Sequence, residues 1–358
     1  MTSVPVVLTR RRATGPSGPV PGETAGEMPT SGPLVDTFAR IHDDLRISVT
    51  DRCNLRCTYC MPEEGMTFLS NSSLLSFDEI VRVASVARSV GVEEVRLTGG
   101  EPLVRRGLDR LIRRLDELGF ADLSLTTNGM LLAPLAPALV EAGLTRVNIS
   151  CDSLRPERFA RIRRRGDLAT VLASMDAAEA AGLPPVKVNV VLEYGSNDDE
   201  ILEFAEFARR TGRIVRFIEF MPLDAQGAWR RDRLVPGSEV LRQIGARWPL
   251  SAVEPADRHA PADRFRFDDG GGEIGVISSV SQPFCGTCNR LRLTADGAIR
   301  NCLFGDDELD VRRLLRSGAP DESIELQLRR AVWGKRPGHG IDEPGFLRPT
   351  RSMSMIGG

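Results

Sequence analysis

Short apolar strands alternate with amphipathic helices over about 180 residues, and this alternation limits the chain to one kind of fold. Apolar side chains recur at helical spacing after each strand, so the strands must be joined by crossover helices. Such a chain forms a parallel sheet, either open or curved into a barrel. The predicted strands are 46–50, 94–98, 122–126, 146–150, 186–192 and 213–219; the predicted helices are 76–90, 107–118, 133–142, 168–181 and 198–210. Six units are fewer than the eight of a closed barrel, which favours a partial (β/α)6 TIM-like barrel of the α/β class with a lateral gap.

Composition excludes several classes of protein. Hydrophobic residues make up 41% of the chain, charged residues 27%, and the net charge is −2. We therefore expect neither nucleic acid nor membrane as a partner. The apolar run Val4–Leu8 is too short for a signal-peptide core, and no apolar segment follows Arg10–Arg12. Six of the seven cysteines fall into two groups of three, which argues against a secreted disulfide framework. These features predict a reducing, cytoplasmic location.

Three regions follow from the local composition. Residues 1–33 are rich in Pro, Gly, Thr and Ser and predict a disordered extension. Residues 34–227 contain the alternating units, in which Ser76 and Glu79 form a capping-box pattern at the start of the first helix. Residues 228–358 form a C-terminal region that opens with a polar, irregular transition over 228–275 and ends in Gly357-Gly358.

Every distinctive motif of the first half follows a predicted strand. Three cysteines follow the first strand, Gly99–Pro102 follows the second, and Thr126–Gly129 follows the third. Ser150–Ser153 and Glu219–Pro222 end the fourth and sixth strands. The carboxyl ends of parallel strands meet at one face of a barrel, and chemistry gathers there. The sequence therefore predicts one active-site face.

The first cysteine group, Cys53, Cys57 and Cys60, has the spacing C-x3-C-x2-C. A structural zinc site and a [4Fe–4S] cluster both take four ligands, so three thiols favour a cluster with one iron open to a small ligand. A disulfide with a spare thiol, or a zinc site completed from elsewhere in the chain, is the alternative.

The second group, Cys285, Cys288 and Cys302, has the spacing C-x2-C-x13-C and is again one ligand short. It fits a second cluster with an open iron, or a zinc site completed by His259 or His339. Arg290 and Arg292 follow in a predicted strand and share one face, which suits phosphate binding; a solvated strand face is the alternative.

Lys187 is one of two lysines in an arginine-rich chain, and it stands in an otherwise apolar strand. A buried charge without a partner would be costly there, so Lys187 is a candidate ligand-binding residue. An edge-facing lysine is the alternative.

The first cysteine group and Gly99–Pro102 resemble the radical S-adenosylmethionine (SAM) superfamily. With the second group the chain closely resembles one family within it, the GTP 3′,8-cyclases of molybdenum cofactor biosynthesis, from about Asp36 to Gly358. The motifs that carry this resemblance are Arg46–Cys53, Arg96–Pro102, Arg216–Pro222, the second cysteine group with Asn289-Arg290-Leu291-Arg292, and the terminal Gly-Gly.

The resemblance implies a radical SAM barrel with a C-terminal extension that carries a second iron–sulfur cluster. It implies two [4Fe–4S] clusters, one held by Cys53, Cys57 and Cys60 and one by Cys285, Cys288 and Cys302, the latter binding guanine at its open iron. The implied SAM contacts are Tyr59, Gly100, Ser150 and Met221. The implied GTP contacts are Arg46, Arg96, Thr126, Lys187, Arg216, Arg290 and Arg292. The Gly-Gly tail is expected to enter the active site. Cys151 stands where the family usually carries an apolar residue, and we expect it to be a small buried hydrophobe.

The implied reaction converts GTP to (8S)-3′,8-cyclo-7,8-dihydroguanosine 5′-triphosphate by a radical route, with no side chain assigned as general acid or base. The implied partners are an external one-electron donor of the flavodoxin or ferredoxin type and, downstream, cyclic pyranopterin monophosphate synthase; a homodimer is left open. Two alternatives remain at this stage. One is a radical SAM peptide maturase with an auxiliary electron-transfer cluster, and the other is a non-enzymatic zinc or electron-transfer protein.

Overall fold

A computed structural model describes residues 26–254 and 257–357. Most of the predicted disordered extension, residues 1–25, and the last residue of the predicted Gly-Gly tail lie outside these ranges. Within them, twelve strands form one sheet that runs in the order β12-β11-β10-β1-β2-β3-β4-β5-β6-β9-β8-β7 and does not close. The predicted α/β partial barrel is confirmed.

The centre of the sheet is the predicted run of six parallel strands. Neighbouring strands pair in chain order, with Arg46 opposite Arg96 and Asn189 opposite Arg216. The predicted strand positions agree with those observed to within two residues. The strands are β1 (Asp44–Ser48), β2 (Glu94–Thr98), β3 (Asp122–Thr127), β4 (Arg146–Ser150), β5 (Lys187–Leu192) and β6 (Ile214–Glu219).

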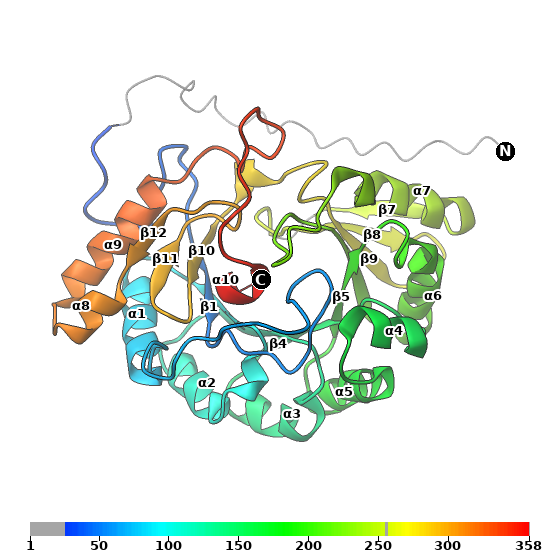
Figure 1. Ribbon diagram of the computed structural model, residues 1–358, viewed down its shortest axis with the longest axis horizontal. Helices are drawn as coiled ribbons and strands as arrows, with labels where there is room; N and C mark the ends of the chain where they lie inside the picture. Colours follow the sequence, from blue (N-terminus) through cyan, green and yellow to red (C-terminus); the bar gives the residue numbers. More distant parts are fainter. Residues whose placement is uncertain (1–25, 255–256, 358) are drawn as a thin grey trace.

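The crossover helices cover the outside of the barrel, as Figure 1 shows. They are α1 (Phe77–Ser89), α2 (Leu108–Asp116), α3 (Leu132–Glu141), α4 (Pro156–Arg163), α5 (Leu168–Ala180) and α6 (Ile201–Thr211). The predicted capping box at α1 is present, because Ser76 and Glu79 each accept a backbone N–H from the other residue. Helix α4 was not expected: its sequence PERFARIR has few apolar residues, although Pro156 and Glu157 are typical helix-start residues.

The C-terminal region adds strands to both edges of the barrel. On one side β9 (Glu273–Ile277) pairs in parallel with β6, followed by antiparallel β8 (Asp263–Phe267) and β7 (Leu250–Val253). On the other side β10 (Arg290–Leu293) pairs in parallel with β1, followed by β11 (Ala298–Arg300) and β12 (Glu308–Asp310). Helices α7 (Gly237–Arg247), α8 (Arg312–Arg316), α9 (Asp321–Trp333) and α10 (Met353–Ile356) complete the region.

The expected irregular transition over residues 228–275 is therefore wrong. It contains α7 and three strands, and only its many Arg, Asp and Pro residues made it read as a loop. In β8 the buried residues Phe265 and Phe267 alternate with charged ones, because this antiparallel edge faces the core on one side only. The structure thus joins the two halves of the chain through one continuous sheet.

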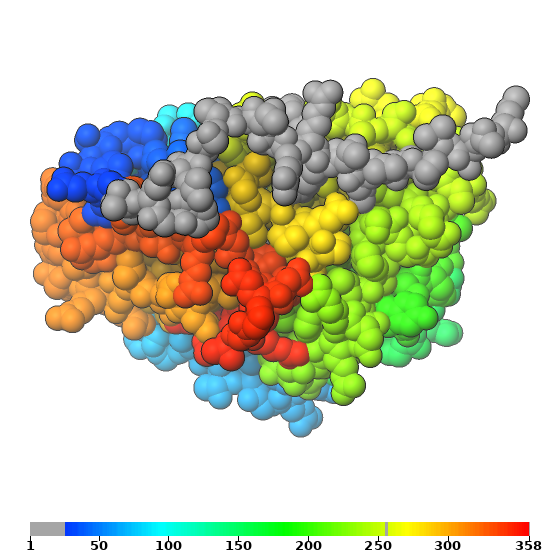
Figure 2. Space-filling view, turned by 90° about the horizontal axis from the view of Figure 1, so that it is seen from above, coloured from blue at the N-terminus to red at the C-terminus, as the bar shows by residue number. Residues whose placement is uncertain are grey.

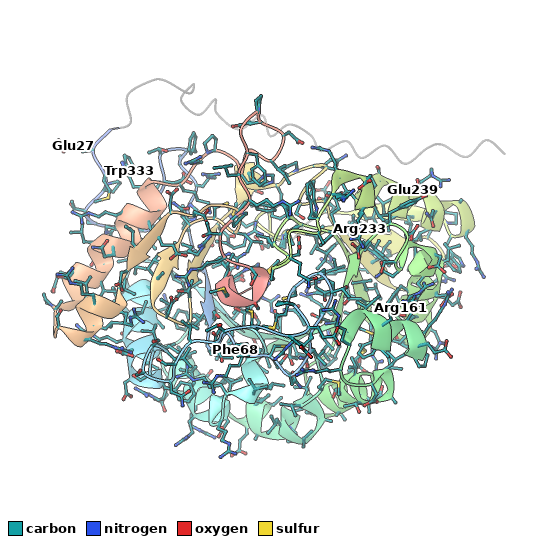
Figure 3. All side chains as sticks on the ribbon, viewed as in Figure 1. Glu27, Phe68, Arg161, Arg233, Glu239 and Trp333 are labelled. Carbon is teal, nitrogen blue, oxygen red and sulfur yellow. The ribbon has the colours of Figure 1, made fainter. Side chains whose placement is uncertain are left out.

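Apolar side chains of the barrel strands face the surrounding helices, and polar side chains face the barrel interior. In β5 the fully buried residues Val188, Val190 and Leu192 pack toward the helices, and alternation turns Lys187 and Asn189 into the barrel. Charged residues such as the exposed Arg161 on α4 and the half-buried Glu239 on α7 lie toward the rim of the molecule (Figure 3). This arrangement leaves the barrel interior free for polar chemistry.

The C-terminal tail runs over the mouth of the barrel. In Figure 1 the chain descends to α10 near the barrel axis, and in Figure 2 the red tail lies between the orange part of the C-terminal region and a yellow-green part of the chain. Over residues 26–254 and 257–357, none of the helices has the length and apolar character to cross a membrane.

Candidate active site

The loop that carries Cys53, Cys57 and Cys60, hereafter the first triplet, leaves β1 at the barrel mouth. Its position is set by a close backbone approach from the segment after β2. The N–H of Gly100 donates to Thr50 O at 2.7 Å, and the N–H of Glu101 donates to Arg52 O at 2.7 Å. A Cβ on Gly100 would lie inside contact distance of Arg52 O and 2.7 Å from Asp51 O. Glycine is thus needed here to seat the cysteine loop, in addition to any approach to a ligand.

Buried donors surround the sulfurs of the first triplet. Arg163 Nη1 lies 3.3 Å from Cys57 Sγ, and Asn128 Nδ2 lies 3.7 Å from Cys53 Sγ. Burial raises the pKa of Cys53 to about 12 and also raises that of Cys60. These thiols would stay protonated without a metal, whereas a bound cluster takes them as thiolates.

A cavity of about 190 Å³, the first cavity, opens onto the first triplet and also contains the four predicted SAM contacts. Tyr59 donates through its hydroxyl to Asp152 Oδ2 at 2.8 Å, and burial raises its pKa. Gly100, Ser150 and Met221 also line this cavity. The structure therefore brings the predicted SAM contacts and their three cysteines together.

Arg163 is a residue of this cavity that the sequence prediction missed. It ends α4, is 2% exposed, and forms a 2.8 Å ion pair with Asp152. Its Nε has no hydrogen-bond partner among the described residues. Because the chain contains so many arginines, the residue type of Arg163 gave no signal. Only the helix-start residues of α4 could have drawn attention to this segment.

The second triplet, Cys285, Cys288 and Cys302, lies beside β10 and lines a second cavity of about 170 Å³. Burial alone would raise the pKa of Cys288, but Arg290 and Lys335 outweigh it and lower that pKa to about 6. Lys335 Nζ lies 3.3 Å from Cys288 Sγ. The second triplet is thus electrostatically unlike the first.

The two histidines considered as zinc ligands have other partners. His339 Nε2 lies 3.0 Å from Ser279 O, and its Nδ1 accepts the N–H of Ile341 at 3.2 Å. His259 Nδ1 lies 2.8 Å from Thr287 O. In the described ranges no three Cys, His, Asp or Glu side chains converge on the position of a single metal ion. Thiolates of a four-iron cluster bind different irons, so three spaced cysteines per cavity fit that group.

The second cavity is also lined by six of the seven predicted GTP contacts. These are Arg46, Arg96, Thr126, Arg216, Arg290 and Arg292. Five guanidinium groups around one small space repel each other. Burial first, and then the neighbouring arginines, lower the pKa of Arg216 to about 9 and that of Arg292 to about 10. The cavity is therefore suited to a ligand with several negative charges.

Unused donors point to the same ligand class. Arg46 Nε, and both Nε and Nη2 of Arg290, are buried and lack an acceptor within the part of the chain that is described. Asp44 lies behind this layer, 3.6 Å from Arg46 Nη2, and offsets part of the charge. Buried unpaired guanidinium donors are costly, so an anion with several oxygens would stabilise this site.

Lys187, the seventh predicted GTP contact, does not line the second cavity. It begins β5 and faces the barrel interior two residues before Asn189, which lines both cavities. Burial, followed by Arg146 and Arg216, lowers the pKa of Lys187 to about 8. It lies deeper in the barrel than the arginines of the cavity and adds to the same positive field.

The two cavities adjoin each other across the barrel mouth. Both are lined by the same five residues: Thr126, Asn189, Ile218, Met221 and Met353. A molecule in the first cavity and a molecule in the second would thus touch the same side chains and lie next to each other. This arrangement can hold two reactants in contact.

The C-terminal tail touches both triplet sites. The backbone N–H of Ser354 donates to Cys60 Sγ, and Arg292 Nη1 donates to Gly357 O. A Cβ on Gly357 would overlap Thr98 and meet Ser48 at 3.0 Å. The described part of the tail therefore enters the barrel, and only glycine fits there.

Two buried groups at the mouth have structural roles. Glu101 accepts hydrogen bonds from Leu103 N, Thr127 Oγ1 and Asn128 N, and so ties the end of β2 to the end of β3. Cys151 is fully buried, donates to Ser153 O at 3.4 Å, and is not among the residues that line the two cavities.

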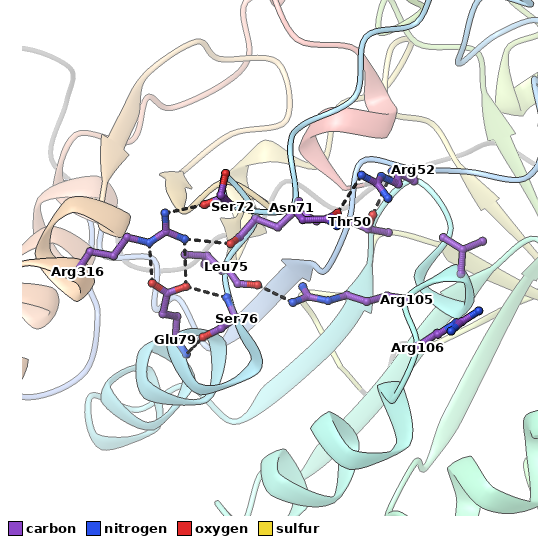
Figure 4. A pocket seen from close by; sticks show the side chains of 12 residues that line it. Thr50, Arg52, Asn71, Ser72, Leu75, Ser76, Glu79, Arg105, Arg106 and Arg316 are labelled. Atoms are coloured by element: carbon purple, nitrogen blue, oxygen red, sulfur yellow. Dashed lines mark hydrogen bonds and ion pairs between the residues drawn. The ribbon is translucent and has the colours of Figure 1, made fainter.

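A larger hollow of about 790 Å³ lies outside the barrel mouth (Figure 4). Arg105 donates to Val49 O and to Leu75 O at 2.6 Å each, and Arg316 of α8 pairs with Glu79 at 2.9 Å. Arg52 donates to Asn71 Oδ1 at 2.9 Å. These bonds hold the segment after the first triplet against α1 and the C-terminal region, and so support the active site from outside. No cysteine lines this hollow.

Two family models match most of the chain. The Radical SAM superfamily matches residues 47–208, and Molybdenum Cofactor Synthesis C matches residues 213–341. The chain is 51% identical to a GTP 3′,8-cyclase of Streptomyces coelicolor over 91% of this chain and 96% of that protein. It is 50% identical to GTP 3′,8-cyclase 2 of Mycobacterium tuberculosis H37Rv over 92% of this chain and 94% of that protein.

Solved structures share the fold at low sequence identity. Streptococcus suis SuiB bound to the precursor peptide SuiA matches 88% of this chain and 67% of that chain, with a TM-score of 0.58 and 13% identity. Native anSMEcpe with bound AdoMet matches 83% of this chain and 81% of that chain, with a TM-score of 0.54 and 14% identity. These likenesses support the architecture alone.

Proposed function

Because this chain belongs to the GTP 3′,8-cyclase family, we infer that its two adjoining cavities form one active site for SAM and GTP. The protein is a radical SAM enzyme that converts GTP to (8S)-3′,8-cyclo-7,8-dihydroguanosine 5′-triphosphate, the first step of molybdenum cofactor biosynthesis. The observation that supports the shared site best is the set of five residues common to both cavities.

Each cavity fits one reactant by the chemistry of its walls. The first cavity combines the first triplet with Tyr59, Gly100, Ser150 and Met221, and would hold SAM on one [4Fe–4S] cluster. The second cavity combines the second triplet with unpaired guanidinium donors, and would hold GTP on a second cluster. The phosphate oxygens would accept hydrogen bonds from the arginine N–H groups that have no acceptor in the protein.

The chain's own contribution is to position the reactants. When bound, SAM and a reduced cluster supply a 5′-deoxyadenosyl radical that takes the 3′ hydrogen of GTP. The cationic layer anchors the triphosphate, and the shared wall of Met221 and Met353 holds the ribose side against the first cavity. Bond formation between C3′ and C8 then requires one electron and one proton to give the product. The tail limits the access of water to both cavities.

The remaining partners follow from the same proposal. A one-electron donor of the flavodoxin or ferredoxin type reduces the first cluster, and cyclic pyranopterin monophosphate synthase takes the product. We place the protein in the cytoplasm as a monomer or homodimer. The peptide-maturase alternative is disfavoured, because the relatives about 50% identical over most of the chain are named as cyclases.

Isotope transfer tests the proposal directly. Anaerobically reconstituted protein with SAM, reductant and GTP deuterated at C3′ should yield 5′-deoxyadenosine that carries one deuterium. GTP deuterated at C2′ is the matched control and should give unlabelled product. If formation of 5′-deoxyadenosine does not depend on GTP, the cyclase assignment is wrong.

The pKa of Lys187 predicts how GTP binding depends on pH. In the free protein this pKa is about 8, and a bound triphosphate would return it toward its ordinary value. Above pH 8, binding must therefore take up a proton, and affinity should fall by up to about tenfold per pH unit. Equilibrium dialysis between pH 7 and 9.5 measures this slope.

Lys187→Arg is the matched variant for that prediction, because a guanidinium at this position keeps its proton to higher pH than an ammonium group does. Its GTP affinity should lose the pH dependence that Lys187 contributes, whereas the titration of guanine and that of Arg216, whose pKa is about 9, are common to both proteins. Equal slopes in the two proteins would assign the pH dependence to a group other than Lys187.

A further inference from the structure

Lys335, the second lysine of the chain, has no part in the GTP site and yet is 5% exposed. It follows α9 and lies against the second triplet. Its Nζ is 3.3 Å from Cys288 Sγ and 2.9 Å from Arg290 O. A buried lysine in a chain that otherwise uses arginine calls for an explanation specific to this position.

The neighbours of Lys335 define where its N–H groups point. Asp36 Oδ2 lies 3.0 Å from His42 Nε2, and a carboxylate can only accept. His42 therefore carries its proton on Nε2, and its Nδ1 is an acceptor that faces Lys335 Nζ at 3.4 Å. Burial lowers the pKa of His42 to about 4, which keeps the ring neutral. The ammonium thus faces four acceptors: Arg290 O, His42 Nδ1, Cys288 Sγ and, at 3.5 Å, Cys288 O.

The same segment also holds the backbone of the second triplet. Arg40 pairs with Asp36 at 2.5 Å and donates to Cys285 O at 2.7 Å and to Arg336 O at 2.7 Å. Residues 36–42 therefore fix both the lysine and the loop it contacts. The Lys335 ammonium is therefore held in a fixed position beside Cys288 Sγ.

We propose that Lys335 is a positioning residue for the second cluster, and that its N–H···S bond to Cys288 raises the reduction potential of that cluster. The proposal rests on the proposed function, because it needs a cluster at the second triplet. The couple is a one-electron step in which the cluster gains an electron from the external donor. Hydrogen bonds to ligand sulfurs and nearby positive charge favour the more negative, reduced form.

The first cluster offers an internal comparison. Its Cys57 receives a hydrogen bond from Arg163, whereas the hydrogen bonds of Lys335 within residues 26–254 and 257–357 go to His42, Cys288 and Arg290 and not to the first triplet. Removal of the Lys335 charge should therefore move one potential and leave the other in place. A general loss of folding would instead affect both clusters.

The test is an EPR-monitored redox titration of the full-length protein with both clusters loaded. The signal that changes on addition of GTP identifies the second cluster. Lys335→Met should lower the reduced-to-oxidised ratio of that cluster about tenfold at a fixed potential, a shift of about 59 mV. Lys335→Arg should restore most of it, since the charge and a donor remain. Arg330→Met removes one positive charge from the exposed face of α9, near Lys335 in the chain, and should leave this potential near that of the wild type.

Iron and sulfide analysis separates the two ways to fail. About four irons per chain in the wild-type protein would show that the second cluster is absent, and this result would rule out the proposed function. About eight irons in both proteins, with a ratio that changes less than threefold in Lys335→Met, would overturn the inference and leave the function standing. If Lys335→Met loses the second cluster, Lys335→Gln takes its place in the test, because glutamine keeps N–H donors without the charge. Its potential should lie below that of the wild type, and an unshifted potential there also overturns the inference.

Discussion

Replacement of Arg292 by methionine should weaken GTP binding by about 30- to 150-fold. The side chain is 4% exposed, lines the second cavity and donates to Gly357 O. Loss of a buried charged hydrogen bond costs about 2–3 kcal/mol, which gives this range of affinity. Binding of GTP to the anaerobic protein, measured without SAM so that no turnover occurs, provides the readout.

The same variant should be at least as stable as the wild type when GTP is absent. Burial and Arg290 lower the pKa of Arg292 to about 10, which indicates that its charge is unfavourable in the free protein. Thermal unfolding without nucleotide checks this second result. Arg161→Met removes an equal charge from the exposed face of α4 and should change neither quantity. A GTP affinity within threefold of wild type in Arg292→Met would show that the second cavity does not bind the triphosphate.

Replacement of Gly100 by alanine should abolish the first cluster and leave the second in place. The new Cβ would overlap the backbone of Asp51 and Arg52, immediately before Cys53, and backbone there has no room to move. The iron content should fall from about eight to about four per chain, and SAM cleavage should be lost.

Gly245→Ala is the matched control for this change. Nothing lies within 4 Å of a Cβ at Gly245 in α7, and alanine suits a helix interior better than glycine. This variant should keep both clusters and full SAM cleavage. Full iron loading of Gly100→Ala would mean that the cysteine loop does not depend on the close approach of residues 99–101.

The sequence predicted the elements whose signals are local. The capping box of Ser76 and Glu79 and the apolar strands each act over a few residues, and the structure confirms them. The glycines after β2 contact residues 50–52 far back in the chain, and their approach to a ligand stays a prediction. The set of GTP-contact candidates came from the family resemblance and not from a local pattern, and the structure places six of them around one cavity. Their individual roles stay predictions.

The features that escaped prediction depend on partners far along the chain. Helix α4 and strand β8 are rich in charge, and their helical or strand pattern appears only where one face meets the core. Strands β7 and β9 are short, with four and five residues. Arg163 gains its place from Asp152 and Cys57, which lie on other elements. Lys335 could have been found: the rarity of lysine that drew attention to Lys187 applies equally to it.

The pairing of β1 with β10 sets an order of events during synthesis. Asn289 and Asp43, which join the two strands by a 2.6 Å hydrogen bond, are 246 residues apart. A ribosome that adds about 5–20 residues per second needs about 12 to 50 s to cover that distance. During this interval β1 has its barrel neighbour β2 and no partner on its other edge, and the first triplet has emerged without the tail that later covers Cys60. The nascent chain therefore offers a time window in which iron and sulfide can reach the first triplet before the tail covers it.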